Sequence, residues 1–131
     1  MKVIVDTCVW SNAFRKKQSS PESIKKLTEL VNDNRVIMLG PIRQELLSGI
    51  KETSMFEKLK EGLNAFPDLL LDTSDYVKAA EFFNICRSKG IQGSNTDFLI
   101  CAVAHEHALL IYTTDKDFQH FSKYLPIKLY E

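Results

Sequence analysis

The sequence predicts a three-layer α/β/α sandwich with a mainly parallel, five-stranded sheet, in a single domain spanning residues 1–131. Short apolar runs alternate with longer amphipathic segments, a pattern typical of parallel strands covered by helices on both faces. The first run, Val3 to Val5, is β-branched throughout, as expected of a strand buried on both faces. With 131 residues, of which 44% are hydrophobic, the chain has the length and the core of one domain.

Strands are predicted from apolar runs, and helices from caps, breakers and helical periodicity. The five predicted strands cover residues 3–5, 35–39, 69–71, 109–113 and 127–129. The helices between them are expected to begin at Ser20-Pro21, Gly40-Pro41, about Met55, Thr73 or Ser74, and Asn95 or Thr96. Gly49 and Gly90 are expected to mark the ends of two of these helices.

Composition excludes several classes of protein. Seventeen basic and seventeen acidic residues leave no net charge, which argues against a polybasic nucleic-acid binder. Cys8, Cys86 and Cys101 are odd in number and widely spaced, which fits neither a disulfide framework nor a thiolate zinc site. A reducing cytoplasm is therefore the expected compartment. No signal peptide, membrane helix or membrane partner is expected.

Four acids are predicted to meet at one edge of the sheet. Asp6 ends the first predicted strand, and Asp115 follows the fourth. Glu45 and Asp97 lie near the starts of two predicted helices. Ligands of open parallel sheets bind beyond the carboxyl ends of the strands, so these side chains are expected to share a crevice.

Such a cluster of acids predicts a bound cation, because the carboxylates repel one another. Two like charges about 5 Å apart repel by roughly 3 kcal/mol at an effective dielectric constant near 20. A divalent ion relieves this repulsion, and a site made only of oxygen ligands selects Mg²⁺ or Mn²⁺ over zinc. A cation of this kind activates water against a phosphodiester, which predicts hydrolysis of nucleic acid. Each acid taken alone also has a structural interpretation, at a strand end, a helix dipole or a turn.

Other chemistries find little support. His105 and His107 point about 200° apart on a helix, whereas a zinc-protease helix needs its histidines four residues apart. They are expected to be a surface pair. The sequence contains neither G-x-G-x-x-G nor a P-loop, so a nucleotide pocket is not expected.

Four segments together resemble the PIN domain, and within it the VapC-type toxin ribonucleases of toxin–antitoxin modules. Each segment is weak alone, but the four in this order are specific. The segments, in chain order, are Val3-Ile4-Val5-Asp6-Thr7, Pro41-Ile42-Arg43-Gln44-Glu45-Leu46 with Gly49, the run from Asp97 to Ala104, and Thr113-Thr114-Asp115-Lys116-Asp117-Phe118.

The resemblance implies a five-stranded parallel α/β/α fold and RNA cleavage that depends on Mg²⁺, with Mn²⁺ as a substitute. It also implies a homodimer and inhibition by a cognate antitoxin. Thr7 and Thr113 would orient carboxylates, while Cys8 stands where many relatives have Asn or Ser and so departs from the pattern. The implied metal-binding acids are Asp6, Glu45, Asp97 and Asp115, with Asp117 as an additional contributor.

Two surfaces are candidates for partners. Basic residues close to the acids in sequence are candidates for RNA phosphate contacts, with solvated charge as the alternative: Arg15, Lys16, Lys17, Arg43 and Lys116. Apolar residues in the 55–66 segment suit a dimer contact or an antitoxin helix, with ordinary core packing as the alternative: Met55, Phe56, Leu59, Leu63 and Phe66.

Two alternative functions remain open on the sequence. One is a catalytically silent PIN-like module that binds RNA or protein, with purely structural acids. The other is a structure-specific DNA nuclease, which is less favoured because so short a chain lacks room for additional helices that thread DNA.

Overall fold

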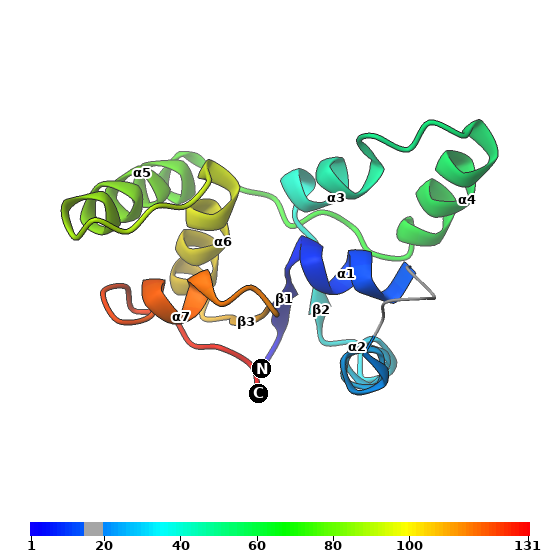
Figure 1. Cartoon of the computed structure of the whole chain (residues 1–131), viewed down its shortest axis with the longest axis horizontal. Helices are drawn as coiled ribbons and strands as arrows, with labels where there is room; N and C mark the ends of the chain where they lie inside the picture. Colours follow the sequence, from blue (N-terminus) through cyan, green and yellow to red (C-terminus); the bar gives the residue numbers. More distant parts are fainter. Residues whose placement is uncertain (15–19) are drawn as a thin grey trace.

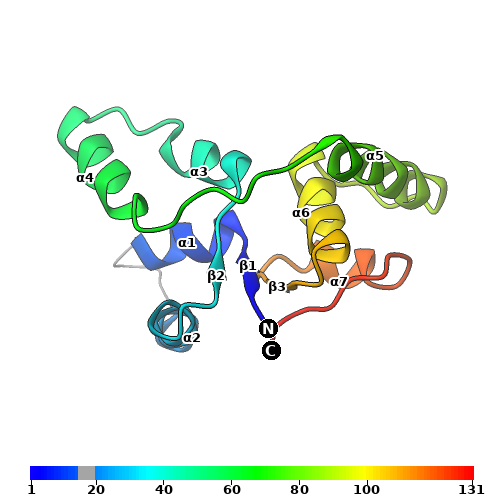
Figure 2. The same ribbon diagram turned by 180° about the vertical axis from the view of Figure 1, so that it is seen from behind.

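The computed structural model describes residues 1–14 and 20–131. Helices cover both faces of a central sheet: α5, α6 and α7 lie on one side of the strands, and α1 to α4 on the other (Figures 1 and 2). The elements, in chain order, are β1 (Val3–Val5), α1 (Thr7–Phe14), α2 (Pro21–Asn32), β2 (Val36–Ile37), α3 (Gly40–Leu47), α4 (Thr53–Leu63), α5 (Thr73–Ser88), α6 (Asn95–Glu106), β3 (Leu110–Tyr112) and α7 (Asp117–Phe121).

The sheet is parallel, and its strand order is β2-β1-β3. Val3 is paired with Val36 on one side and Leu110 on the other, which makes β1 the central strand. The acid that follows β1 therefore lies between two neighbouring strand ends, where ligands bind in folds of this kind.

The two outer predicted strands are reduced to single bridges. Asp68 pairs with Met38 beyond β2, and Leu129 pairs with Ile111 beyond β3, so five parallel chain segments lie side by side. Within the described ranges the regular sheet thus has three strands where the sequence predicts five.

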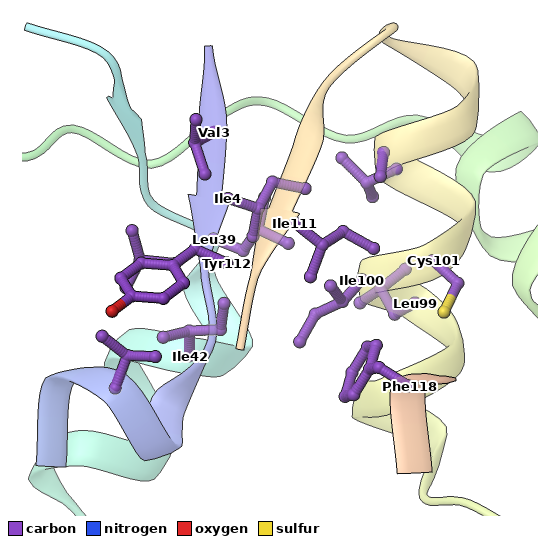
Figure 3. Packing of buried hydrophobic residues seen from close by; sticks show 14 of the residues in the cluster. Val3, Ile4, Leu39, Ile42, Leu99, Ile100, Cys101, Ile111, Tyr112 and Phe118 are labelled. Carbon is purple, nitrogen blue, oxygen red and sulfur yellow. The ribbon is translucent and has the colours of Figure 1, made fainter. Parts of the chain in front are cut away.

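The core lies on both faces of the sheet, between the strands and α6 on one side and between the strands and α1, α2 and α3 on the other. All three residues of β1 are fully buried, and every residue of α6 from Phe98 to Ala104 is buried as well. Figure 3 shows Ile111 of β3 beside Ile100 of α6, whereas Tyr112 points to the opposite face, toward Ile42 of α3. This alternation is the period of two expected of a strand with helices on both faces.

Two helix caps differ from the sequence prediction by one or two residues. Ser20 caps α2 as predicted. The cap of α5 is Asp72 instead of Thr73 or Ser74, and the cap of α6 is Ser94 instead of Asn95 or Thr96. Both helices begin with a capping box, in which the residue three positions after the cap bonds back to it, and this reciprocal partner fixes the helix start.

Two glycines end helices as predicted. Gly49 follows α3 with a φ of 86°, and Gly90 follows α5 with a φ of 74°. Side-chain-bearing residues rarely adopt such angles, so glycine permits the chain to turn here. Within the described ranges, no helix is both long and apolar enough to span a bilayer.

Candidate active site

The structure brings the four predicted acids into one open depression of about 370 Å³. They come from four separate parts of the chain: the segments that follow β1 and β3, the second turn of α3 and the first turn of α6. The residues that line the depression are Asp6, Thr7, Cys8, Ser11, Asn12, Glu45, Asp97 and Asp115.

Asp6 is the most buried of these acids, with 6% of its surface exposed. Its Oδ2 accepts hydrogen bonds from Thr113 Oγ1 at 2.8 Å and from the Cys8 thiol at 3.4 Å. Its Oδ1 accepts from the backbone N–H of Thr7 at 2.8 Å. Asp6 is thus held by donors from both α1 and the segment after β3, and a buried carboxylate needs such partners.

Glu45 is exposed and lies opposite the start of α1. Thr7 Oγ1 donates to Glu45 Oε1 at 2.7 Å. This bond joins α1 to α3 across the depression and is the contact expected of a threonine that orients a carboxylate.

Asp97 is the third residue of α6, where it belongs to the capping box of that helix. Its backbone N–H donates to Ser94 Oγ at 3.0 Å, and its Oδ2 accepts from the Ser94 N–H at 3.0 Å. Burial raises the pKa of Asp97 above its usual value, the charges of Asp6 and Asp115 add to this rise, and the bonds to Ser94 oppose it. The proximity of the acids therefore carries an electrostatic cost.

Asp115 is placed by the loop between β3 and α7. Its backbone N–H donates to Thr113 Oγ1 at 3.0 Å, and its Oδ1 accepts from the N–H of Asp117 at 2.9 Å. The side chain of Asp117 is exposed and does not line the depression. The structure thus brings Asp115 to the site but leaves the Asp117 carboxylate outside it.

The basic residues predicted to contact RNA divide into three groups. The guanidinium of Arg43 donates to Asp68 Oδ1 at 2.9 Å and to the carbonyl oxygens of Leu63 and Phe66. Three donors of Arg43 thus tie α3 to the end of α4 and the residues that follow it, which gives this side chain a structural role that the sequence did not indicate. Lys116 is exposed beside Asp115. Arg15, Lys16 and Lys17 lie outside the described residues.

The donor set of the depression fits a hard divalent cation. Among the described residues that line it, no lysine or arginine offsets the four carboxylates. Carboxylate and hydroxyl oxygens are ligands that Mg²⁺ and Mn²⁺ prefer. The acids are not drawn into a tight cluster, however: in the described part of the chain, no three His, Cys, Asp or Glu side chains already form a metal-binding group.

Sequence reasoning missed the contacts of three residues. Ser11 and Asn12 line the depression together with Cys8. Spacings of three and four residues place them on the same face of α1 as Cys8. This helical spacing could have predicted from the sequence that they line the site. His105 and His107 are both exposed, as expected, but the sequence did not indicate that Nε2 of His107 lies 3.1 Å from Oδ1 of the buried Asp75.

The PIN domain family profile matches residues 3–124 of the chain. The protein therefore belongs to the PIN domain family, as its sequence motifs predicted. It is 30% identical over 120 residues to Ribonuclease VapC11 of Mycobacterium tuberculosis, and equally to VapC ribonuclease Mb1587 of Mycobacterium bovis. Each match covers 88% of this chain and 88% of the relative.

Solved structures of other proteins share the fold. VapBC2 from Rickettsia felis, bound to a DNA fragment from its promoter, superposes with a TM-score of 0.80 at 19% identity, covering 99% of this chain and 98% of that one. FitAcB from Neisseria gonorrhoeae gives 0.79 at 19% identity, with 98% and 96% covered. These likenesses confirm the predicted class of fold.

Proposed function

We propose that this chain is the toxin of a toxin–antitoxin pair, an endoribonuclease that requires Mg²⁺ or Mn²⁺. The observation that carries the proposal is the meeting of Asp6, Glu45, Asp97 and Asp115 in one depression without a basic residue among its described lining. The ribonuclease activity named for the relatives at 30% identity supports the same conclusion.

In this mechanism the four carboxylates would hold the cation, and neighbouring hydroxyl, thiol and backbone N–H donors hold the carboxylates. When bound, a divalent ion polarises a phosphodiester and lowers the pKa of a water, which prepares that water for attack at phosphorus. Thr113 and Cys8 fix Oδ2 of Asp6, and Thr7 fixes Oε1 of Glu45. Ser94 fixes Oδ2 of Asp97. Each acid thus presents a defined orientation to the depression.

The activity is tested by incubating purified protein with matched single-stranded RNA and DNA, in Mn²⁺ or in EDTA. We expect cleavage of RNA in Mn²⁺ and none in EDTA. Asp6→Asn should abolish cleavage and remain folded, whereas the same change at the exposed Asp33 should have no effect. If the parent binds RNA but never cuts it, the chain is a silent binding module, and preferential cleavage of DNA would make it a DNA nuclease.

An apolar groove between α1 and α4 is the proposed docking surface for the antitoxin. It has a volume of about 590 Å³ and contains Phe14 and Met55, which are 49% and 58% exposed. Trp10 lies at its base, with an indole N–H that is buried and has no hydrogen-bond partner among the described residues. A groove of this character suits the apolar face of an amphipathic helix, and similar folds occur in VapBC and FitAB complexes.

A homodimer and a cytoplasmic location complete the proposal. The helix α5 exposes three large apolar side chains, Tyr76, Val77 and Ile85, which is typical of a surface covered by a partner. Light scattering of the purified protein tests the dimer. All three cysteines are free, which suits the reducing compartment where RNA is found.

A further inference from the structure

The thiol of Cys8 lies within the candidate site. Cys8 is in the first turn of α1, is half-buried and lines the depression that holds the four acids. Three oxygen atoms surround its sulfur: Oγ1 of Thr114 at 3.3 Å, Oδ2 of Asp6 at 3.4 Å and Oγ1 of Thr113 at 3.5 Å. The other two cysteines are fully buried in the core, so this polar setting is peculiar to Cys8.

The available protons fix the direction of these hydrogen bonds. Thr113 has one hydroxyl proton, which it donates to Asp6 Oδ2 at 2.8 Å, while its oxygen accepts from the N–H of Asp115. An ionised Asp6 has no proton to give. The thiol proton of Cys8 is therefore directed to Asp6, and Thr114 donates its own proton to the sulfur. The result is a chain of donors from Thr114 through Cys8 to Asp6.

We infer that Cys8 is a positioning residue for Asp6: its thiol, held in place by Thr114, fixes the carboxylate in the orientation used to bind the divalent cation. The inference rests on the proposed function. Asp6 receives three donors, from Thr7, Thr113 and Cys8, which together define the plane of its carboxylate. The bond from Thr114 prevents the thiol from rotating away from that plane. Neighbours that orient a metal ligand in this way affect metal affinity more than folding.

The chemistry of Cys8 separates this role from simple packing. Serine has one donor and an accepting oxygen in place of the sulfur, so Cys8→Ser can keep the chain of hydrogen bonds. Alanine fills most of the same space but has neither a donor nor an acceptor. The residue Thr114 is exposed and has no role in the core, so Thr114→Val removes only its hydroxyl.

The test is a Mn²⁺ titration of the metal-stripped protein, followed by thermal unfolding and repeated for RNA cleavage. The variants are Cys8→Ala, Cys8→Ser, Thr114→Val and the double variant Cys8→Ala/Thr114→Val. Unfolding without metal shows that each variant is folded. We expect Cys8→Ala to raise the Mn²⁺ concentration at half-effect by about tenfold, at the lower end of effects seen for neighbours of metal ligands. Cys8→Ser should remain close to the parent.

The double variant makes the test specific, because coupled residues give non-additive effects. Thr114→Val should raise the Mn²⁺ requirement when Cys8 is present and have no further effect when Ala replaces it. A Cys8→Ala titration that matches the parent, or an equal effect of Thr114→Val in both backgrounds, would overturn the inference. If the parent cuts RNA with Mn²⁺ but the variants have the same Mn²⁺ requirement as the parent, the positioning role alone fails. If the parent shows no response to Mn²⁺, the proposed metal dependence fails and the positioning role fails with it.

Discussion

The imidazole Nε2 of His107 lies 3.1 Å from the carboxylate Oδ1 of Asp75, a side chain that is only 1% exposed. His107 is the C-cap of α6, and Asp75 lies in the first turn of α5, where its Oδ2 accepts from the backbone N–H of Asp72. The pair thus joins the two helices that pack together on one face of the sheet, and α6 carries Asp97. It is a structural contact between elements that position the site.

Removing His107 is expected to destabilise the fold. His107→Ala leaves Oδ1 of the buried Asp75 without this partner, and an unsatisfied buried acceptor costs about 1 to 3 kcal/mol. Urea unfolding at neutral pH measures the loss. The matched control is His120→Ala, an exposed histidine of α7, for which we expect a change within about 0.5 kcal/mol. Equal stabilities of the two variants would refute the structural role of the pair.

The raised pKa of Asp97 predicts how stability depends on pH. Because the folded protein binds this proton more readily than the unfolded chain does, the protonated acid contributes stability that is fully present below the ordinary value of 3.8. That stability is lost as the pH rises through the higher pKa of the folded state. At neutral pH, the charge of the half-buried Asp97 therefore lowers the stability of the metal-free parent.

Asp97→Asn should remove this destabilising charge while keeping an oxygen acceptor for the N–H of Ser94. We expect the metal-free variant to unfold at a higher temperature than the parent at pH 7, and the difference to shrink as the pH falls toward 3.8. Thermal unfolding across this range in EDTA is the measurement. A difference that stays constant with pH would mean that the charge of Asp97 is not the cause.

Mutations of Arg43 and Lys116 are expected to affect different properties, the stability of the fold for Arg43 and RNA binding for Lys116. Arg43→Ala should lower stability, because its guanidinium holds Asp68 and two backbone carbonyls. Arg43→Lys should restore little of this loss, since an ammonium lacks the planar fork of donors. Lys116→Ala should leave stability unchanged and weaken RNA binding with a shallower salt dependence. Unfolding curves and filter binding at several salt concentrations distinguish the two roles.

The groove between α1 and α4 provides a test of antitoxin binding. Met55 is 58% exposed at this groove, so Met55→Asp should leave the fold intact while placing a charge on an apolar docking surface. We expect the variant to lose co-purification with a co-expressed cognate antitoxin and to keep its ribonuclease activity. Fluorescence of Trp10, the single tryptophan, reports binding at the same groove. Retained binding by the variant would place the antitoxin elsewhere.

The alternation of strands and helices and the meeting of the four acids were predictable from the sequence, whereas the helices α1 and α7 were not placed by it. Asp6 and Asp115 follow apolar runs that pair in parallel, and such strands end at one edge of a sheet. Asp97 was placed in the first turn of a helix because of its position after a loop. These predictions depend on apolar runs and helix starts along the chain and on the rule that parallel strands end at one edge of a sheet. They did not require knowledge of contacts between distant residues.

The remaining features depend on partners that the sequence does not specify. Arg43 is close to Glu45 along the chain, yet its donors are used by Asp68, Leu63 and Phe66 in another segment. His107 finds Asp75 across two helices, a separation of 32 residues. The outer strands shorten to single bridges, Met38 with Asp68 and Ile111 with Leu129, and the extent of these pairings cannot be read from the apolar runs alone. In each case a distant partner decided the outcome.

The most direct test of the central claim is the rate of RNA cleavage by the double variant Asp6→Asn/Asp97→Asn compared with each single variant in saturating Mn²⁺. If the acids hold the cation as a unit, each single change should abolish most of the activity, and the double change should cost little more. Cleavage at the parent rate by any of the three folded variants would contradict the account, as would independent effects that multiply in the double variant.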